Sequence, residues 1–305
     1  MHAGNFITER MSCLDWRGSG ISLAMRWEGG RRSSNIEDRR GIGMGTIGGG
    51  GIGMLLLVLT VSCLTGTNPL ALLQMAEQAA PQQQTQNVPT GAPTNDPQAE
   101  FISVVLGDTE QTWGRVFAQS GRRYEEPVLV LFEDAVRSGC GSASSASGPF
   151  YCPADHKVYL DLSFFRELDQ RFGAPGDFAQ AYVVAHEVGH HVQNLLGTNR
   201  QVQEAQQSGG SRAGANALSV QLELQADCLA GVWGHHAGKK NLLDAGDIDE
   251  GISAAAAIGD DRLTRGRVSP DSFTHGTSAQ RSQWLRRGLE TGDINSCDTF
   301  RSSTF

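Results

Sequence analysis

The strongest chemical signal in the 305-residue sequence is the motif His186-Glu187-Val188-Gly189-His190. It lies in the apolar-rich stretch AYVVAHEVGHHVQNLL, whose spacing is that of a helix. Residues four apart share a helix face, so His186 and His190 can offer two imidazole nitrogens to one ion. Glu187 is one residue on and can reach a water held by that ion. This pattern of two histidines and a carboxylate is typical of zinc-dependent peptide hydrolysis.

A zinc site of this kind has three protein ligands, and Glu223 is the candidate for the third. The chain has Gln193 and Leu196 where the metzincin pattern needs Gly and His, so that class is excluded. Glu223 lies in a second apolar-striped stretch, VQLELQADCLAGVW, four residues before Asp227. We expect Glu223 to bind the metal and Asp227 to accept a hydrogen bond from a ligand histidine's other nitrogen. The alternative is a pair of exposed acids on a solvated helix face.

The flanks of these motifs resemble a known family. HEVGHH, LELQADCLAGVW and the early MRWEGGRRSSNIEDRRG are similar to the bacterial YpfJ-like neutral zinc metallopeptidases. The resemblance runs from Met25 almost to the C-terminus and includes GCGSASSASGPFYCPADHKVYLDLSFF and FTHGTSAQR. It implies a zincin-like α+β domain that holds one zinc ion and acts on a peptide or protein substrate.

A more distant resemblance, to the CAAX-protease-like gluzincins, brings in residues near the C-terminus. It implies that His275 donates a hydrogen bond to the developing oxyanion, with Arg281 as a weaker candidate one turn on. The alternative is a histidine at a helix entry, with Thr277 or Ser278 as the N-cap. Resemblance to zincins also implies that the strand Lys157–Leu162 is a sheet edge that pairs with extended substrate.

The elements that must position these residues are mostly helical. Two runs, Pro127–Phe132 and Lys157–Leu162, have the composition of strands. Helical spacing predicts helices over Phe101–Gln119, Ser163–Phe172, Asp177–Leu196, Ala213–His236, Asp247–Ile258 and Ser278–Leu289. A helix, two strands and then mainly helices indicate an α+β fold with a small sheet.

The region before this domain predicts a membrane anchor. No residue from Gly41 to Ala76 is charged, so we expect a transmembrane helix over residues 41–66. Arginines precede it, which predicts that residues 1–40 form a cytoplasmic tail. The zinc metallopeptidase domain, residues 100–305, would then face outward from the bacterial inner membrane, in the periplasm or outside the cell. The alternatives are a cleaved signal peptide and a Gly-rich loop beside a short core helix.

Two further boundaries follow from composition. Residues 67–99 are rich in Gln and Pro and are expected to be a flexible linker. Met25 is a candidate true start, which would make residues 1–24 a start-site mis-assignment. The net charge of −8 argues against nucleic acid as a partner, because phosphate binding needs a basic surface. The sequence implies no particular oligomeric state.

Four of the six cysteines, namely Cys140, Cys152, Cys228 and Cys297, fall in the domain and allow three pairings. An outward-facing domain lies where disulfides form. Cys140 and Cys152 flank a short Gly/Ser loop and can pair locally, and Cys228 would then join Cys297. Free buried thiols are the alternative. Cysteine ligation of a metal is disfavoured, because the sequence has no C-x-x-C pair.

Together these features predict a membrane-anchored zinc metallopeptidase. Glu187 would take a proton from the attacking water and pass it to the leaving amine. The alternative in another class is a non-catalytic, zinc-stabilised binding protein of the envelope. Glu187 argues against it, because a structural zinc site needs no general base.

Overall fold

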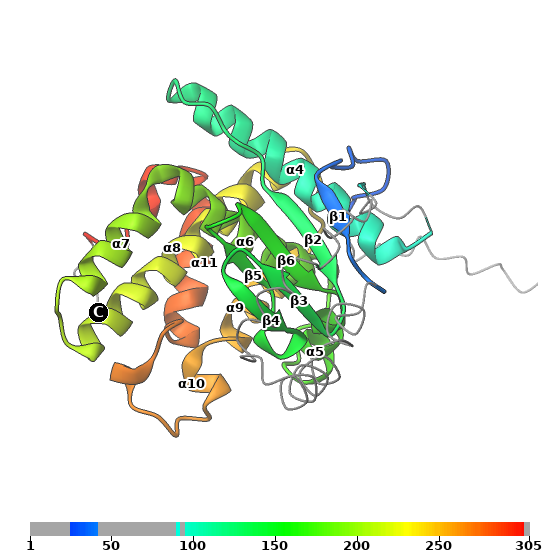
Figure 1. The fold of residues 1–305 in the computed structure, drawn as a ribbon. Helices are drawn as coiled ribbons and strands as arrows, with labels where there is room; N and C mark the ends of the chain where they lie inside the picture. The colour runs from blue at the N-terminus through cyan, green and yellow to red at the C-terminus, as the bar shows by residue number, and fades with distance from the viewer. Residues whose placement is uncertain (1–24, 42–89, 92–94, 302–305) are drawn as a thin grey trace, which may run out of the picture.

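The computed structural model describes residues 25–41, 90–91 and 95–301, which form a mixed fold of helices around a small sheet (Figure 1). The helices of the described residues are α4 (Pro97–Gln119), α5 (Ser163–Gln170), α6 (Asp177–Leu196), α7 (Thr198–Gln207), α8 (Arg212–Lys239), α9 (Asp247–Ala257), α10 (Asp260–Leu263) and α11 (Ser278–Thr291). The strands are β1 (Ile36–Asp38), β2 (Val128–Phe132), β3 (Ala135–Ser138), β4 (Gly141–Ser144), β5 (Phe150–Cys152) and β6 (Lys157–Asp161).

The main sheet has the strand order β1-β2-β6-β5. β1 and β6 both run parallel to β2, and β5 pairs antiparallel with β6. The two strands expected from the sequence are therefore the two central ones, whose apolar runs are buried on both sides. The expectation that Lys157–Leu162 forms a sheet edge is wrong, because β5 covers it. The short β5 is the edge strand on that side.

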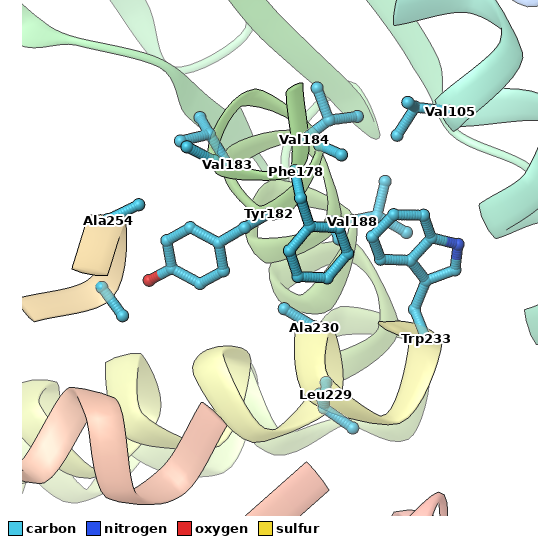
Figure 2. Packing of buried hydrophobic residues seen from close by; sticks show 14 of the residues in the cluster. Val105, Phe178, Tyr182, Val183, Val184, Val188, Leu229, Ala230, Trp233 and Ala254 are labelled. Carbon is cyan, nitrogen blue, oxygen red and sulfur yellow. The ribbon is translucent and has the colours of Figure 1, made fainter. Parts of the chain in front are cut away.

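The helix α6 lies at the centre of the hydrophobic core, which is why nearly all of its faces are apolar. Its side chains Phe178 and Tyr182 point toward α8, where Phe178 stacks on Trp233 with ring centroids 5.9 Å apart (Figure 2). The helix ends at Gly197, whose φ of 86° suits glycine and lets the chain turn at once into α7. The predicted bounds Asp177–Leu196 match the observed ones.

Helix α8 packs closely against α11, which lies beside it in Figure 1. Gly231 of α8 and Gly288 of α11 make this possible. A Cβ on Gly288 would overlap the carbonyl oxygen of Cys228 and lie 2.7 Å from the Val232 nitrogen. Only glycine fits such a backbone-to-backbone approach.

Both predicted disulfides are present. Cys140 of the β3–β4 hairpin is bonded to Cys152 of β5, and Cys228 of α8 is bonded to Cys297. The first joins the hairpin to the edge strand. The second joins the helix that carries Glu223 to the C-terminal segment.

Residues 25–40 belong to the same folded unit as residues 95–301, which differs from the expected start of the domain at Glu100. Strand β1 pairs with β2 over three residues, and Ile36 is almost fully buried. The backbone nitrogen of Arg26 donates to the Leu242 carbonyl, 2.8 Å away. The expected division between a tail, residues 1–40, and a domain that begins at residue 100 therefore does not hold for residues 25–40.

The arginines that suggested a cytoplasmic flank are engaged within this unit. Each pairs with a carboxylate of the fold, and the pairs are Arg26–Asp244, Arg31–Glu110, Arg32–Glu100, Arg39–Glu37 and Arg40 with both Asp38 and Asp96. Their positive charge thus has a structural use that the sequence pattern did not reveal.

The expected transmembrane helix (41–66) and most of the expected linker (67–99) fall outside the described residues. Within residues 25–41, 90–91 and 95–301, no helix is both long and apolar enough to cross a membrane. The last three residues of the expected linker, 97–99, are the first turn of α4, capped by the Asp96 carboxylate.

Candidate metal centre

Three side chains converge on one point between α6 and α8. His186 and His190 lie one turn apart on α6, and Glu223 faces them from α8. The two Nε2 atoms lie 3.2 and 3.3 Å from different oxygens of the Glu223 carboxylate. Among the described residues, this is the only group of three or more His, Cys, Asp or Glu side chains that could hold a metal ion.

The spacing of these donors fits zinc. Zn–N and Zn–O bonds of about 2.1 Å in a tetrahedron put the ligand atoms roughly 3.4 Å apart. The two observed separations are close to this value. Three protein donors, with the fourth side open to a cleft, are the arrangement of catalytic rather than structural zinc sites.

Each histidine of the centre is held through its other ring nitrogen. Nδ1 of His186 lies 2.9 Å from an oxygen of Asp227, and Nδ1 of His190 lies 2.9 Å from Oε1 of Gln193. The amide of Gln193 in turn donates to the Leu222 carbonyl on α8, 2.7 Å away. These acceptors favour a hydrogen on Nδ1, which would leave the Nε2 lone pair of each ring for a metal ion.

The electrostatics of the cluster follow from burial and charge. Burial alone would raise the pKa of Glu223, but His190 and His186 hold it well below its ordinary value. Glu187 is buried, and its pKa is raised chiefly because its carboxylate is removed from water. A carboxylate whose pKa is raised is a better proton acceptor.

Glu187 faces a cleft of about 740 Å³ that also exposes the three candidate ligands. The edge strand β5 forms one wall, with Phe150 and Tyr151. This wall is therefore the edge of the main sheet, the position that we had expected of Lys157–Leu162. A cleft of this size next to the donors can admit a peptide segment.

His275 lines the same cleft from the loop before α11. Asp260, the first residue of α10, holds this loop, because its carboxylate accepts hydrogen bonds from the backbone nitrogens of Thr274, His275 and Gly276. It also lies 3.1 Å from Nδ1 of His275 and raises the pKa of that ring. Thr277 is the N-cap of α11, as the alternative of a histidine at a helix entry expected.

Arg281 does not face the cleft as a free cation, since only 2% of it is exposed. Its guanidinium lies against the Asp227 carboxylate. His191 is likewise buried, between Tyr151 and the Glu125 carbonyl, and takes no part in the metal centre.

Sequence reasoning missed Gln193 and Asp260. The signal for Gln193 was available, since it lies three residues after His190 and therefore on the same helix face. Asp260 carried no such signal, because it is 15 residues from His275 in the chain and meets it only through the loop.

The HExxH helix and the glutamate from a later helix, beside an open cleft, match the donor arrangement typical of zinc-dependent metallopeptidases. Comparison with known proteins gives the family. The profile of the family described as "Putative neutral zinc metallopeptidase" matches residues 25–300. The chain belongs to this family.

Two relatives show how far the similarity extends. The Escherichia coli (strain K12) protein named "Uncharacterized protein YpfJ" is 48% identical over 291 residues, which cover 92% of this chain and 100% of that protein. "Uncharacterized protein Rv2575" of Mycobacterium tuberculosis (strain ATCC 25618 / H37Rv) is 46% identical over 194 residues, 59% of this chain and 64% of that protein. No solved structure matches the chain significantly.

Proposed function

We propose that this protein is a zinc-dependent endopeptidase with a zincin-like catalytic domain. The observation that carries the proposal is the placement of Glu187 beside three convergent donors, at the wall of a cleft. His186, His190 and Glu223 would hold one Zn²⁺. A zinc ion bound there supplies a Lewis acid that polarises the scissile carbonyl and lowers the pKa of bound water toward 7.

The residues of the chain supply the remaining steps. An extended peptide or protein segment binds along the free side of β5. Glu187 takes a proton from the attacking water and later gives it to the leaving amine. His275, protonated and oriented by Asp260, donates a hydrogen bond from Nε2 to the oxygen on which negative charge develops.

The test is zinc content together with cleavage of an unstructured protein such as casein, for the full chain and for Glu187→Ala. We expect one zinc per chain in both proteins and cleavage only by the wild type. Zinc in both proteins without cleavage by either would favour a non-catalytic, zinc-stabilised binding protein. A folded wild type without zinc would contradict the metal centre.

We propose further that the described parts of the chain lie together outside the cytoplasm, near the membrane. Two disulfides support an oxidising compartment. Because β1 pairs with β2, residues 25–41 and 95–301 must lie on the same face of any membrane. This changes the arrangement expected from the sequence, which put residues 1–40 and 100–305 on opposite faces.

Labelling in intact cells tests this arrangement. Single cysteines would replace the exposed residues Glu28 and Glu290, in a background with Cys13→Ser and Cys63→Ser. A membrane-impermeant maleimide should label both positions. Labelling at position 290 alone would restore the arrangement with a cytoplasmic N-terminal part, and labelling at neither would place the domain in the cytoplasm.

A further inference from the structure

Arg281 contacts each of the elements that carry the metal centre. Its Nε and Nη2 donate to the two oxygens of Asp227 on α8, at 2.8 and 2.9 Å. Nη2 also lies 3.2 Å from the hydroxyl of Tyr182 on α6. Nη1 donates to the Ile258 carbonyl, 3.3 Å away, at the end of α9 and two residues before Asp260.

The two hydrogen bonds from Arg281 hold the Asp227 carboxylate in a single orientation. One of its oxygens, Oδ1, lies 2.9 Å from Nδ1 of His186 and 2.6 Å from the Tyr182 hydroxyl. Two parallel hydrogen bonds from a planar guanidinium fix the plane of a carboxylate, which a single bond would not do. The direction in which His186 presents Nε2 therefore depends on Arg281.

We propose that Arg281 is a positioning residue of the metal centre. By holding Asp227, it keeps the hydrogen of His186 on Nδ1 and the Nε2 lone pair directed at the ion. The inference rests on the metal centre proposed above. It concerns metal affinity, and so it is independent of whether the protein cleaves peptides.

The ion pair between Arg281 and Asp227 is not needed to join α11 to α8. The close contact through Gly231 and Gly288 already joins these helices, and the bond between Cys228 and Cys297 ties α8 to the segment that follows α11. Arg281 and Asp227 are moreover both almost fully buried, and a buried ion pair contributes little net stability compared with apolar side chains. A role in orientation accounts for the placement of these charges beside His186.

The sign of the change in zinc affinity distinguishes positioning from simple electrostatics. Arg281 is a cation whose Nη2 lies 4.0 Å from a Glu223 oxygen. By charge alone, its removal would tighten binding of Zn²⁺. If Arg281 acts by orienting Asp227, its removal weakens binding, because loss of such supporting contacts typically costs about 10- to 100-fold in metal affinity.

The experiment measures zinc affinity by chelator competition for the wild type, Arg281→Gln and the control Arg286→Gln. Arg286 lies on the exposed side of the same helix. We expect roughly 10- to 100-fold weaker binding for Arg281→Gln and no change for the control. Nitrogen-15 spectra of the zinc-loaded proteins should show His186 with hydrogen on Nδ1 and none on Nε2 in the wild type, and should show more than one state of this ring in Arg281→Gln.

Arg281→Gln leaves a buried carboxylate without its partner and can therefore fail to fold. A second variant keeps the inference testable in that case. The double variant Asp227→Asn/Arg281→Gln removes both charges. It should bind zinc as weakly as Asp227→Asn alone, because Arg281 acts through Asp227. Unchanged or tighter zinc binding in folded Arg281→Gln, or a double variant that differs from Asp227→Asn, would overturn the inference. A wild type that binds no zinc would instead refute the metal centre itself.

Discussion

The contact between α8 and α11 gives a sharp prediction, because the outcome of replacing glycine by alanine depends on the surroundings. Gly288→Ala would place a methyl group 2.7 Å from the Val232 nitrogen and 2.9 Å from the Cys228 carbonyl carbon. These are backbone atoms of a helix and cannot rotate away. Overpacking of this kind costs about 1–3 kcal/mol, and we take the upper end. The gain in helix propensity, about 1 kcal/mol, leaves a net loss of about 2 kcal/mol.

Gly114→Ala in α4 is the matched control. A Cβ there has no neighbour within 4 Å, so only the propensity term acts and stability should rise by about 1 kcal/mol. For a domain of this size, each kcal/mol shifts the melting temperature by about 2–4 °C. Thermal melts with the disulfides intact should therefore show Gly288→Ala about 4–8 °C below the wild type and Gly114→Ala slightly above it. Equal stabilisation of both variants would refute the close helix contact.

Three further predictions concern the site and the domain that holds it. His275→Ala should slow peptide cleavage roughly 100-fold with zinc content unchanged, and unchanged turnover would remove His275 from the reaction. Replacing Cys228 and Cys297 by serine opens a loop of 69 residues and should lower the free energy of unfolding by about 4 kcal/mol in urea titrations, whereas a loss below 1 kcal/mol would show that the bond adds little. Burial raises the pKa of Asp247, so its contribution to stability is present below the unfolded-state pKa and lost as pH rises through the folded-state value. Asp247→Asn should therefore raise the melting temperature at pH 7 and lose this advantage near pH 3, and the opposite order would contradict a desolvated carboxylate.

Local sequence patterns predicted the parts of the fold that local physics decides. Helix α6 has an N-terminal boundary at a Gly-Asp pair, a continuous apolar pattern and a terminal glycine, and its predicted bounds match. The central strand β2 was recognised as a buried apolar run, and β6 was recognised by its alternating pattern. The edge strands β1 and β5 have three residues each, too short to show a period.

In the candidate site, too, local sequence predicted some residues and tertiary contacts decide the others. His186, Glu187 and His190 share one helix, and their meeting was predicted from a spacing of four. Glu223 was predicted because it lies in a second apolar-striped helix, four residues before Asp227. The partners Gln193 and Asp260, and the depth at which Arg281 is buried, depend on how helices and loops meet in space, which no local pattern records.

The N-terminal segment shows a further limit. Its arginines gave the charge pattern of a cytoplasmic flank, but they pair with acids distributed from Glu37 to Asp244. Charge asymmetry around an apolar stretch predicts orientation only when the charges have no other partner. Long-range ion pairs and the pairing of β1 with β2 are tertiary features.

The central claim is that this chain hydrolyses peptide bonds with Glu187 as the base. The most direct measurement is cleavage of casein in water enriched in oxygen-18, followed by mass spectrometry of the new C-termini. Zinc-loaded wild type should produce peptides with one oxygen-18 in each new carboxyl group, and zinc-loaded Glu187→Gln should produce none. Equal cleavage by both proteins would contradict the account.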